Sequence, residues 1–176
     1  GVFGTVNIQH EKKLEAYAQR NKQGDILCYG KDTRTAMMCP QSPYVQAHVL
    51  AQLQDTITTF AYDEVFLDIP WIMRGGCHCN YCTTHPENQS KVRSSLSKLV
   101  NELRSARANI QLSVNASAPA IHDNTQAGGH VENLKGLFDA YITEWNPYRW
   151  HQSPEIVGAS IARAQKVTDK PVYHAT

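Results

Sequence analysis

The chain has 176 residues, of which 41% are hydrophobic and 19% are charged, and its formal net charge at pH 7 is +1. These values are ordinary for one globular domain that is large enough to bury a hydrophobic core without disulfide bonds or metal ions to stabilise it. A net charge this small excludes a strong positive electrostatic potential that would attract nucleic acid or an anionic membrane surface. No apolar run approaches the roughly 18 residues of a membrane span. We therefore predict a single domain over residues 1–176, with no nucleic-acid partner and no membrane partner.

The N-terminal part of the chain contains short apolar stretches separated by polar ones. Residues 2–8 (VFGTVNI) are apolar and β-prone, which predicts a strand. Residues 11–20 predict a short helix, and residues 26–29 predict a second short strand.

A clear helix start follows at Ser42 and Pro43, because serine is a common N-cap and proline fits the first helical turn. Apolar residues then recur at helical spacing from Val45 to Phe60, which predicts one apolar stripe along this helix. Residues 65–68 predict a strand that is apolar until its last residue, an aspartate.

The same alternation continues to the end of the chain. The predicted elements are a helix over 92–103, a strand over 110–115, a short helix over 132–139, a strand over 141–144, a helix over 154–167 and a strand over 172–174. Strands that alternate with helices through short connections predict parallel pairing with right-handed crossovers.

Both a doubly wound sheet and a (β/α)8 barrel of the TIM type fit this order. The barrel is favoured because HEKKLE, rather than a glycine-rich phosphate loop, follows the first strand. Polar residues also end several different strands, where barrels build their active sites; they are Asp68, Asn115, Glu144 and His174. A complete barrel needs about 200 to 250 residues. The predicted fold class is therefore α/β, a (β/α)8 TIM-type barrel that is incomplete in this chain.

An incomplete barrel leaves strand edges that can pair with further strands. We expect one or two βα units to be missing at the start and at least one at the end. The partners predicted on this ground are the remainder of a longer chain or further copies in an oligomer.

Residues 77–82 read CHCNYC and contain three of the five cysteines in the chain. Cys77, Cys79 and Cys82 are too crowded to pair comfortably with one another, and an odd total leaves one cysteine over in a disulfide framework. Clustered thiolates with this spacing are typical of a metal site, and a closed structural zinc site takes four ligands. We therefore predict a structural zinc ion rather than a catalytic one.

The fourth ligand has four candidates: Cys28, Cys39, His78 and His85. Cys39 is favoured, since in a barrel it precedes one helix while the cluster follows the next strand, so both loops lie at the same end of neighbouring units. Cys28 falls in a possible strand, where a buried and inert cysteine is the simpler interpretation.

Asp68 and Glu144 each end an apolar or β-prone strand. Two carboxyl groups that face one cavity are what glycoside hydrolysis uses, one as an acid and the other as a nucleophile or base. The structural alternatives are that Asp68 caps the turn after its strand and that Glu144 forms an ion pair with Arg149 or Arg74.

The residues near these carboxylates are those of a sugar-binding site. Aromatic faces stack on sugar rings, and polar side chains bind hydroxyl groups. The tryptophans also fit ordinary packing. The predicted substrate-binding residues are Trp71, Asn115, Trp145, Asn146 and His174.

The stretch from Cys39 to Cys82 resembles the barrel family called hypothetical glycosyl hydrolases, which is similar to the α-L-fucosidases and to zinc β-galactosidases with a four-cysteine cluster. The motifs that carry this resemblance are CPQSP at 39–43, the strand ending in Asp68, and the C-x-C-x-x-C run at 77–82. The resemblance also implies that Cys39 is the fourth ligand.

The resemblance implies a role for Asp68 as well, although the two related types differ. In the β-galactosidase type the strand ends in Asn-Glu and the glutamate is the acid/base, whereas Leu67-Asp68 is closer to the fucosidase type, in which the aspartate is the nucleophile. Glu144 is the expected partner, as acid/base if Asp68 is the nucleophile. The predicted function is a glycoside hydrolase, most consistent with a retaining mechanism.

Two other functions remain open from the sequence. One is a non-catalytic carbohydrate-binding or scaffold domain on a degenerate barrel with a structural zinc. The other is a metal-dependent hydrolase, against which all-thiolate ligation argues, because four thiolates leave no coordination position for water.

Overall fold

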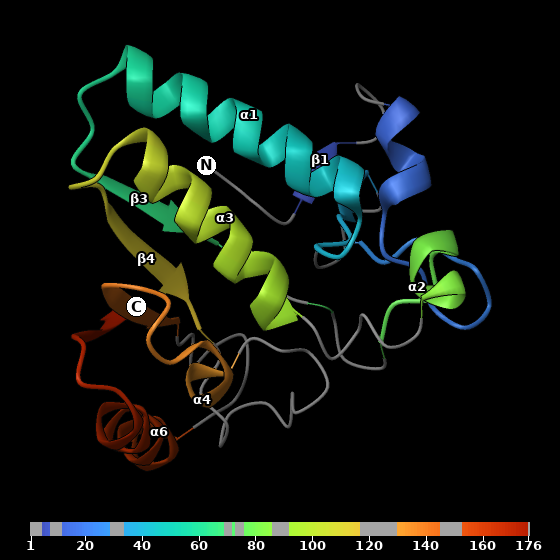
Figure 1. The fold of residues 1–176 in the computed structure, drawn as a ribbon. Coiled ribbons are helices and arrows are strands. Elements are labelled where there is room, and N and C mark those ends of the chain that lie inside the picture. Colours follow the sequence, from blue (N-terminus) through green and yellow to red (C-terminus); the bar gives the residue numbers. More distant parts are fainter. Residues whose placement is uncertain are drawn as a thin grey trace.

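Four parallel strands form the main sheet of the computed structural model (Figure 1), which describes residues 5–7, 12–28, 34–68, 72, 76–85, 92–116, 130–144 and 153–175. The strands are β3 (Glu64–Leu67), β4 (Gln111–Asn115), β5 (Ala140–Glu144) and β6 (Val172–Ala175). They lie in the order β3-β4-β5-β6, and every neighbouring pair is parallel.

This strand order decides between the two folds that the sequence left open. A doubly wound sheet reverses its strand order part-way across. Here each strand lies beside the next one in the chain, so right-handed crossovers place successive helices on the same side, as in a barrel. The prediction of an α/β fold with an incomplete TIM-type barrel is confirmed, because the described sheet has four strands in barrel order and is not closed.

The helices are α1 (Pro43–Thr59), α2 (Asn80–Thr84), α3 (Val92–Ala106), α4 (Val131–Leu134) and α6 (Pro154–Val167). In Figure 1, α1 and α3 lie side by side along β3 and β4, while α6 lies near β6. Among the described residues, no helix is both long enough and apolar enough to cross a membrane.

The helix predicted to start at Ser42 and Pro43 begins there, with Ser42 at the N-cap and Pro43 in the first turn. The Ser42 side chain makes no capping hydrogen bond. The helix predicted over 132–139 also stops early, because Gly136 adopts φ 78°, a left-handed conformation that ends a helix.

The N-terminal segment differs from its prediction. Strand β1 (Thr5–Asn7) pairs antiparallel with β2 (Thr35–Met37), a short strand that the sequence reading missed. The predicted helix over 11–20 is the 3₁₀ helix η1 (Lys12–Tyr17), and residues 26–28 form only isolated bridges. Parallel pairing needs a crossover that covers the sheet, usually an α-helix, and one short 3₁₀ helix does not provide it.

The core lies between the sheet and helices α1 and α3. Strand residues Val65 and Leu67 and their neighbours Leu112 and Val114 are all buried in one cluster. Helix α3 contributes a stripe to the same cluster at helical spacing, namely Val92, Leu96, Leu99, Val100 and Leu103. Alternate strand positions therefore belong to the helix-covered face, and the positions between them belong to the other face.

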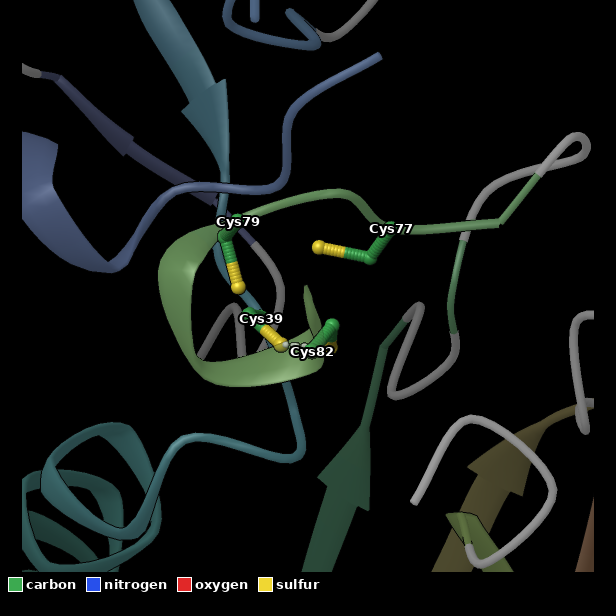
Figure 2. A group of neighbouring side chains, drawn as sticks. All are labelled: Cys39, Cys77, Cys79 and Cys82. Carbon is green, nitrogen blue, oxygen red and sulfur yellow. Dashed lines mark hydrogen bonds between the residues drawn. The ribbon is translucent and has the colours of Figure 1, made fainter. Parts of the chain in front are cut away.

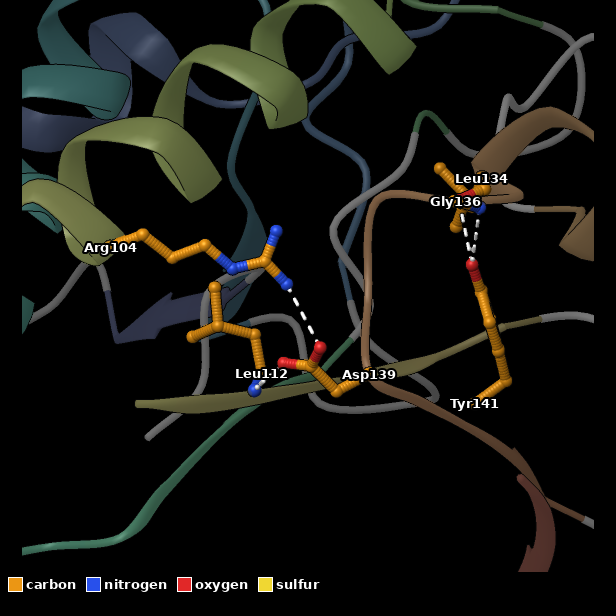
Figure 3. A network of polar contacts seen from close by, with 6 residues as sticks. All are labelled: Arg104, Leu112, Leu134, Gly136, Asp139 and Tyr141. Atoms are coloured by element: carbon orange, nitrogen blue, oxygen red, sulfur yellow. Dashed lines mark hydrogen bonds and ion pairs between the residues drawn. The ribbon is translucent and has the colours of Figure 1, made fainter. Parts of the chain in front are cut away.

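Asp139 joins the N-terminal ends of two strands to helix α3 (Figure 3). One carboxylate oxygen lies 3.0 Å from the Arg104 guanidinium, and the other accepts the Leu112 N–H at 2.9 Å. The Asp139 N–H donates in turn to the Leu112 carbonyl at 2.8 Å. A carboxylate that is paired with arginine and with a backbone N–H stabilises the fold and has a structural role.

Tyr141 makes a second buried connection at the start of β5. Its hydroxyl donates to the Leu134 carbonyl at 2.9 Å and accepts the Gly136 N–H at 3.1 Å, as Figure 3 shows. The side chain is fully buried, and this desolvation raises the pKa of the Tyr141 phenol above its ordinary value of 10.0.

We predict that Tyr141→Phe lowers the free energy of unfolding by about 1 to 3 kcal/mol, since it leaves the buried Leu134 carbonyl without its donor. Urea unfolding would measure this loss. Tyr173→Phe is the matched control, because Tyr173 is 57% exposed. Equal stability of Tyr141→Phe and the wild type would contradict the structural role of this hydroxyl.

The same hydroxyl gives a pH dependence. Because the folded state holds the Tyr141 phenol neutral, the unfolded state loses this proton first as the pH rises past about 10. The wild type should therefore lose stability above about pH 10 relative to lower pH. This part of the loss should be absent from Tyr141→Phe in unfolding curves measured across that range.

Candidate functional site

The four cysteines of the predicted cluster come from two segments of the chain. Cys39 follows β2, where its N–H donates to the Tyr17 carbonyl at 3.0 Å. Cys77 comes directly after Gly76, whose φ of 83° turns the chain in a conformation that favours glycine. Cys79 is the N-cap residue of α2, and Cys82 lies inside that helix.

Their sulfur atoms converge on one point. All four lie within 4.8 Å of one another, and those of Cys39 and Cys82 are 3.5 Å apart. Figure 2 shows the four side chains turned toward a common centre, with Cys79 and Cys82 on the turn of α2. Each cysteine is at most 2% exposed, and all four are free thiols.

The other candidates for the fourth ligand lie elsewhere. Cys28 is half-buried, and its Sγ lies 3.8 Å from the Ile26 carbonyl. His85 is exposed, and its Nδ1 lies 2.9 Å from the Thr84 hydroxyl. His78 does not belong to the group of converging ligand atoms. Cys39 is therefore the fourth member of this group of cysteines, and its role as a metal ligand stays a prediction.

The donor set fits a metal ion. Hydrogen bonds with Cys77, Cys79 and Cys82, together with burial, raise the pKa of the Cys39 thiol, while the hydrogen bond with Cys39 lowers the pKa of Cys79. Four thiolates cannot stay ionised side by side in a buried place without a cation. A tetrahedral ion with bonds of about 2.3 Å separates its sulfurs by about 3.8 Å, which agrees with the spacing here.

Asp68 and Asn115 form a second polar pair, at the C-terminal edge of the parallel sheet. Asp68 directly follows β3 and is half-buried, and Asn115 is the last residue of β4 and is 4% exposed. The Asn115 Nδ2 donates to the Asp68 Oδ1 at 2.8 Å. The two residues that the sequence placed at strand ends are therefore in direct contact.

The strand register extends this pair into a row across the sheet. Asn115 is paired with Ile142 of β5, and Ile142 is paired with Tyr173 of β6. Asp68, Asn115, Ile142 and Tyr173 thus occupy equivalent positions on four successive strands. Glu144 ends β5 two residues beyond Ile142, where it is paired with Ala175.

For several predicted site residues the structure describes the backbone alone or does not describe the residue. Trp71, Trp145 and Asn146 lie outside the described residues, and so do the side chains of Glu144 and His174. The backbone places Glu144 at the same edge of the sheet as Asn115.

The sequence reading missed two features of this face. Ser113 donates a hydrogen bond to the Glu64 carboxylate one layer below the Asp68 pair. Tyr173 lies on the same face of the sheet as Asn115, because both are in register with Ile142. Its neighbour His174 is paired with Thr143 and therefore belongs to the opposite face. The alternation of strand positions could have indicated Tyr173, but the register needed for that comparison is not visible in the sequence.

A cavity of about 500 Å³ lies at the other end of the sheet. It is lined by residues of the N-terminal edge, among them Arg104, Gln111, Asp139 and Lys170. Active sites of barrels lie at the C-terminal edge, so this cavity is distinct from the site at Asp68.

No protein-family model and no curated protein matches the sequence of this chain. Its fold matches solved structures. A cycloisomaltooligosaccharide glucanotransferase from Paenibacillus sp., solved with cycloisomaltoheptaose, covers 99% of this chain with a TM-score of 0.63 at 14% identity. The glycoside hydrolase domain of PgaB (BpsB) from Bordetella bronchiseptica covers 91% with a TM-score of 0.59 at 10% identity. Alpha-L-fucosidase isoenzyme 2 from Paenibacillus thiaminolyticus covers 99% with a TM-score of 0.53 at 12% identity.

This chain spans 25%, 56% and 33% of those three chains, in the same order. At such low identity the similarity concerns the fold. The chain therefore has part of a TIM-barrel fold whose structural neighbours include glycoside hydrolases.

Proposed function

We propose that this chain is the catalytic part of a glycoside hydrolase of the retaining type, with Asp68 as nucleophile and Glu144 as acid/base. The observation that carries the proposal is the Asp68 carboxylate, half-buried at the C-terminal edge of a barrel sheet and bound by the Asn115 amide. Barrel enzymes place their reacting groups at this edge. The glycoside hydrolases among the structural neighbours share the fold and support the same reaction class.

In the proposed reaction, the Asp68 carboxylate attacks the anomeric carbon while the Glu144 carboxylic acid gives its proton to the leaving oxygen. The glycosidic bond breaks, and a glycosyl ester forms on Asp68. Glu144, now ionised, takes a proton from water, whose oxygen attacks the same carbon and releases the ester. Asp68 returns as the carboxylate and Glu144 as the acid.

The backbone geometry is compatible with this pair. Asp68 and Glu144 are separated by two strand spacings and by two residues of rise along β5, so their Cα atoms lie roughly 12 Å apart. Two side chains that point toward each other shorten this span. A retaining enzyme needs carboxyl groups about 5 Å apart, and an inverting one needs about 6.5 to 9.5 Å.

The sugar contacts of the proposed site come from the loops and strand ends around this pair. Trp71 and Trp145 would stack on sugar rings, and Asn146 and His174 would bind hydroxyl groups. These assignments rest on residue type and on position in the sequence.

The four-cysteine cluster would hold a structural zinc ion through Cys39, Cys77, Cys79 and Cys82. Zinc is supported by the donor set, since four thiolates arranged tetrahedrally are typical of structural zinc sites. The ion would neutralise the buried thiolates and join the segment before α1 to the loop after β3. All four positions would be filled by sulfur, so the chemistry of the reaction is left to the carboxylates.

The hydrolase proposal predicts covalent labelling of Asp68. A panel of 2-fluoro glycosyl fluorides with gluco, galacto and fuco configurations should include one that inactivates the chain. Peptide mapping by mass spectrometry should then find the sugar on Asp68. Asp68→Asn should abolish labelling, while Asp55→Asn, an exposed position on α1, should leave it unchanged.

Two results would count against this proposal. Labelling of a residue other than Asp68 would assign a different nucleophile. Sugar binding that survives Asp68→Asn, with no labelling and no hydrolysis in the wild type, would instead identify a non-catalytic carbohydrate-binding domain.

The zinc proposal predicts close to one zinc ion per chain by elemental analysis. Cys79→Ser should lower both the zinc content and the melting temperature, because it removes one buried ligand. Cys28→Ser is the matched control and should change neither, since Cys28 lies outside the cluster. A metal-free protein with disulfides among these cysteines would refute the assignment.

A further inference from the structure

We infer that Asn115 is a positioning residue that holds the Asp68 carboxylate in its reactive orientation. This inference rests on the proposed function, in which Asp68 is the nucleophile. It gives Asn115 a different task from the sugar contact that the sequence predicted, because its amide acts through Asp68.

The contact itself is well placed for this task. The Asn115 Nδ2 donates to the Asp68 Oδ1 at 2.8 Å across adjacent parallel strands. Among the described residues, Asn115 is the one side chain that hydrogen-bonds Asp68. A carboxylate at a strand end otherwise rotates among several rotamers, and a hydrogen bond to its charged oxygen selects one of them.

Asn115 is itself held in place. It is 4% exposed and ends β4, where it is paired with Ile142. The N–H of the next residue, Ala116, donates to the Ile142 carbonyl at 2.8 Å. Hydrogen bonds between β4 and β5 therefore hold the backbone from which the Asn115 side chain projects. A donor on a rigid strand transmits that rigidity to the group that it binds.

The kind of donor also matters. Asp139, at the opposite edge of the sheet, is paired with the Arg104 guanidinium at 3.0 Å, which neutralises its charge. Asp68 instead accepts a hydrogen bond from the uncharged Asn115 amide. Among the described side chains, no cation lies within ion-pair distance of Asp68. A neutral donor orients the carboxylate on Oδ1 without cancelling its charge, and it leaves Oδ2 to attack a carbon.

The first part of the test needs no substrate. Crystal structures of the wild type and of Asn115→Ala should show the Asp68 carboxylate in one rotamer in the wild type and spread over more than one in the variant. An unchanged Asp68 carboxylate in Asn115→Ala would overturn the inference.

The second part measures the rate of covalent labelling, using the fluorosugar that labels the wild type. The limiting rate should fall by about 10²-fold in Asn115→Ala, because small displacements of a reacting group cost rates of this size. The half-saturating concentration should change less than about three-fold, since the lost interaction acts on the reaction and not on sugar binding.

Two further variants separate orientation from packing. Asn115→Asp keeps the shape of the side chain but replaces the N–H donor with an acceptor, so it should lose at least as much rate as Asn115→Ala. Ser113→Ala removes the neighbouring hydrogen bond to Glu64 on the same strand and should label at close to the wild-type rate.

The outcomes are distinct. A wild-type rate in Asn115→Asp, or a loss confined to the half-saturating concentration in Asn115→Ala, would overturn the positioning role and favour packing or a direct sugar contact. A wild type that no fluorosugar labels would refute the hydrolase proposal. The two crystal structures would still decide whether Asn115 holds Asp68.

Discussion

Parallel hydrogen bonding among β3, β4, β5 and β6 is the constraint on which the rest of the molecule depends. Parallel strands run in the same direction, so their C-terminal residues meet at one edge of the sheet. Asp68 and Asn115 are 47 residues apart in the chain, yet this pairing brings their side chains to 2.8 Å. The same ladder places the backbone of Glu144 at that edge. The site is therefore built on the sheet, which is more rigid than a loop.

The cysteine cluster adds a second long-range connection close to this edge. Cys39 and Cys82 are 43 residues apart, and the segment between them contains α1, β3 and Asp68. An ion bound by the four sulfurs would close this segment at both ends and reduce the conformations open to it in the unfolded chain. The cluster and the core are continuous, because the four cysteines belong to the same buried group as Leu67 and Ile72.

Two aspartates of the sheet have different tertiary contacts, and we propose different roles for them. Asp139 and Asp68 both lie beside a strand of the sheet, but they are at opposite edges and have different partners. Asp139 binds an arginine and a backbone N–H, which use both of its oxygens. Asp68 binds one neutral amide. The first arrangement stabilises the fold, and the second orients a charge at the edge where barrel enzymes react.

Much of this architecture could be predicted because it depends on local pattern. The apolar stripe of α1 and the proline at its start placed that helix correctly, and the apolar runs before Asp68 and Asn115 placed two strands. The N-terminal segment could not be predicted in the same way. Its short stretches satisfy their hydrogen bonds with one another, in an antiparallel pair and isolated bridges, and local sequence does not specify such partners.

The sequence by itself determined the alternation of strands and helices, the three cysteines of the C-x-C-x-x-C run and the acidic residue at the end of β3. These features depend on periodicity, spacing and residue type within short segments. Only the tertiary structure decided that Cys39, rather than Cys28 or a histidine, completes the cluster, and that the Asn115 amide is bound to Asp68. Both outcomes depend on the register between strands and on how distant segments pack, and a one-residue shift in register would have moved Asn115 to the other face of the sheet.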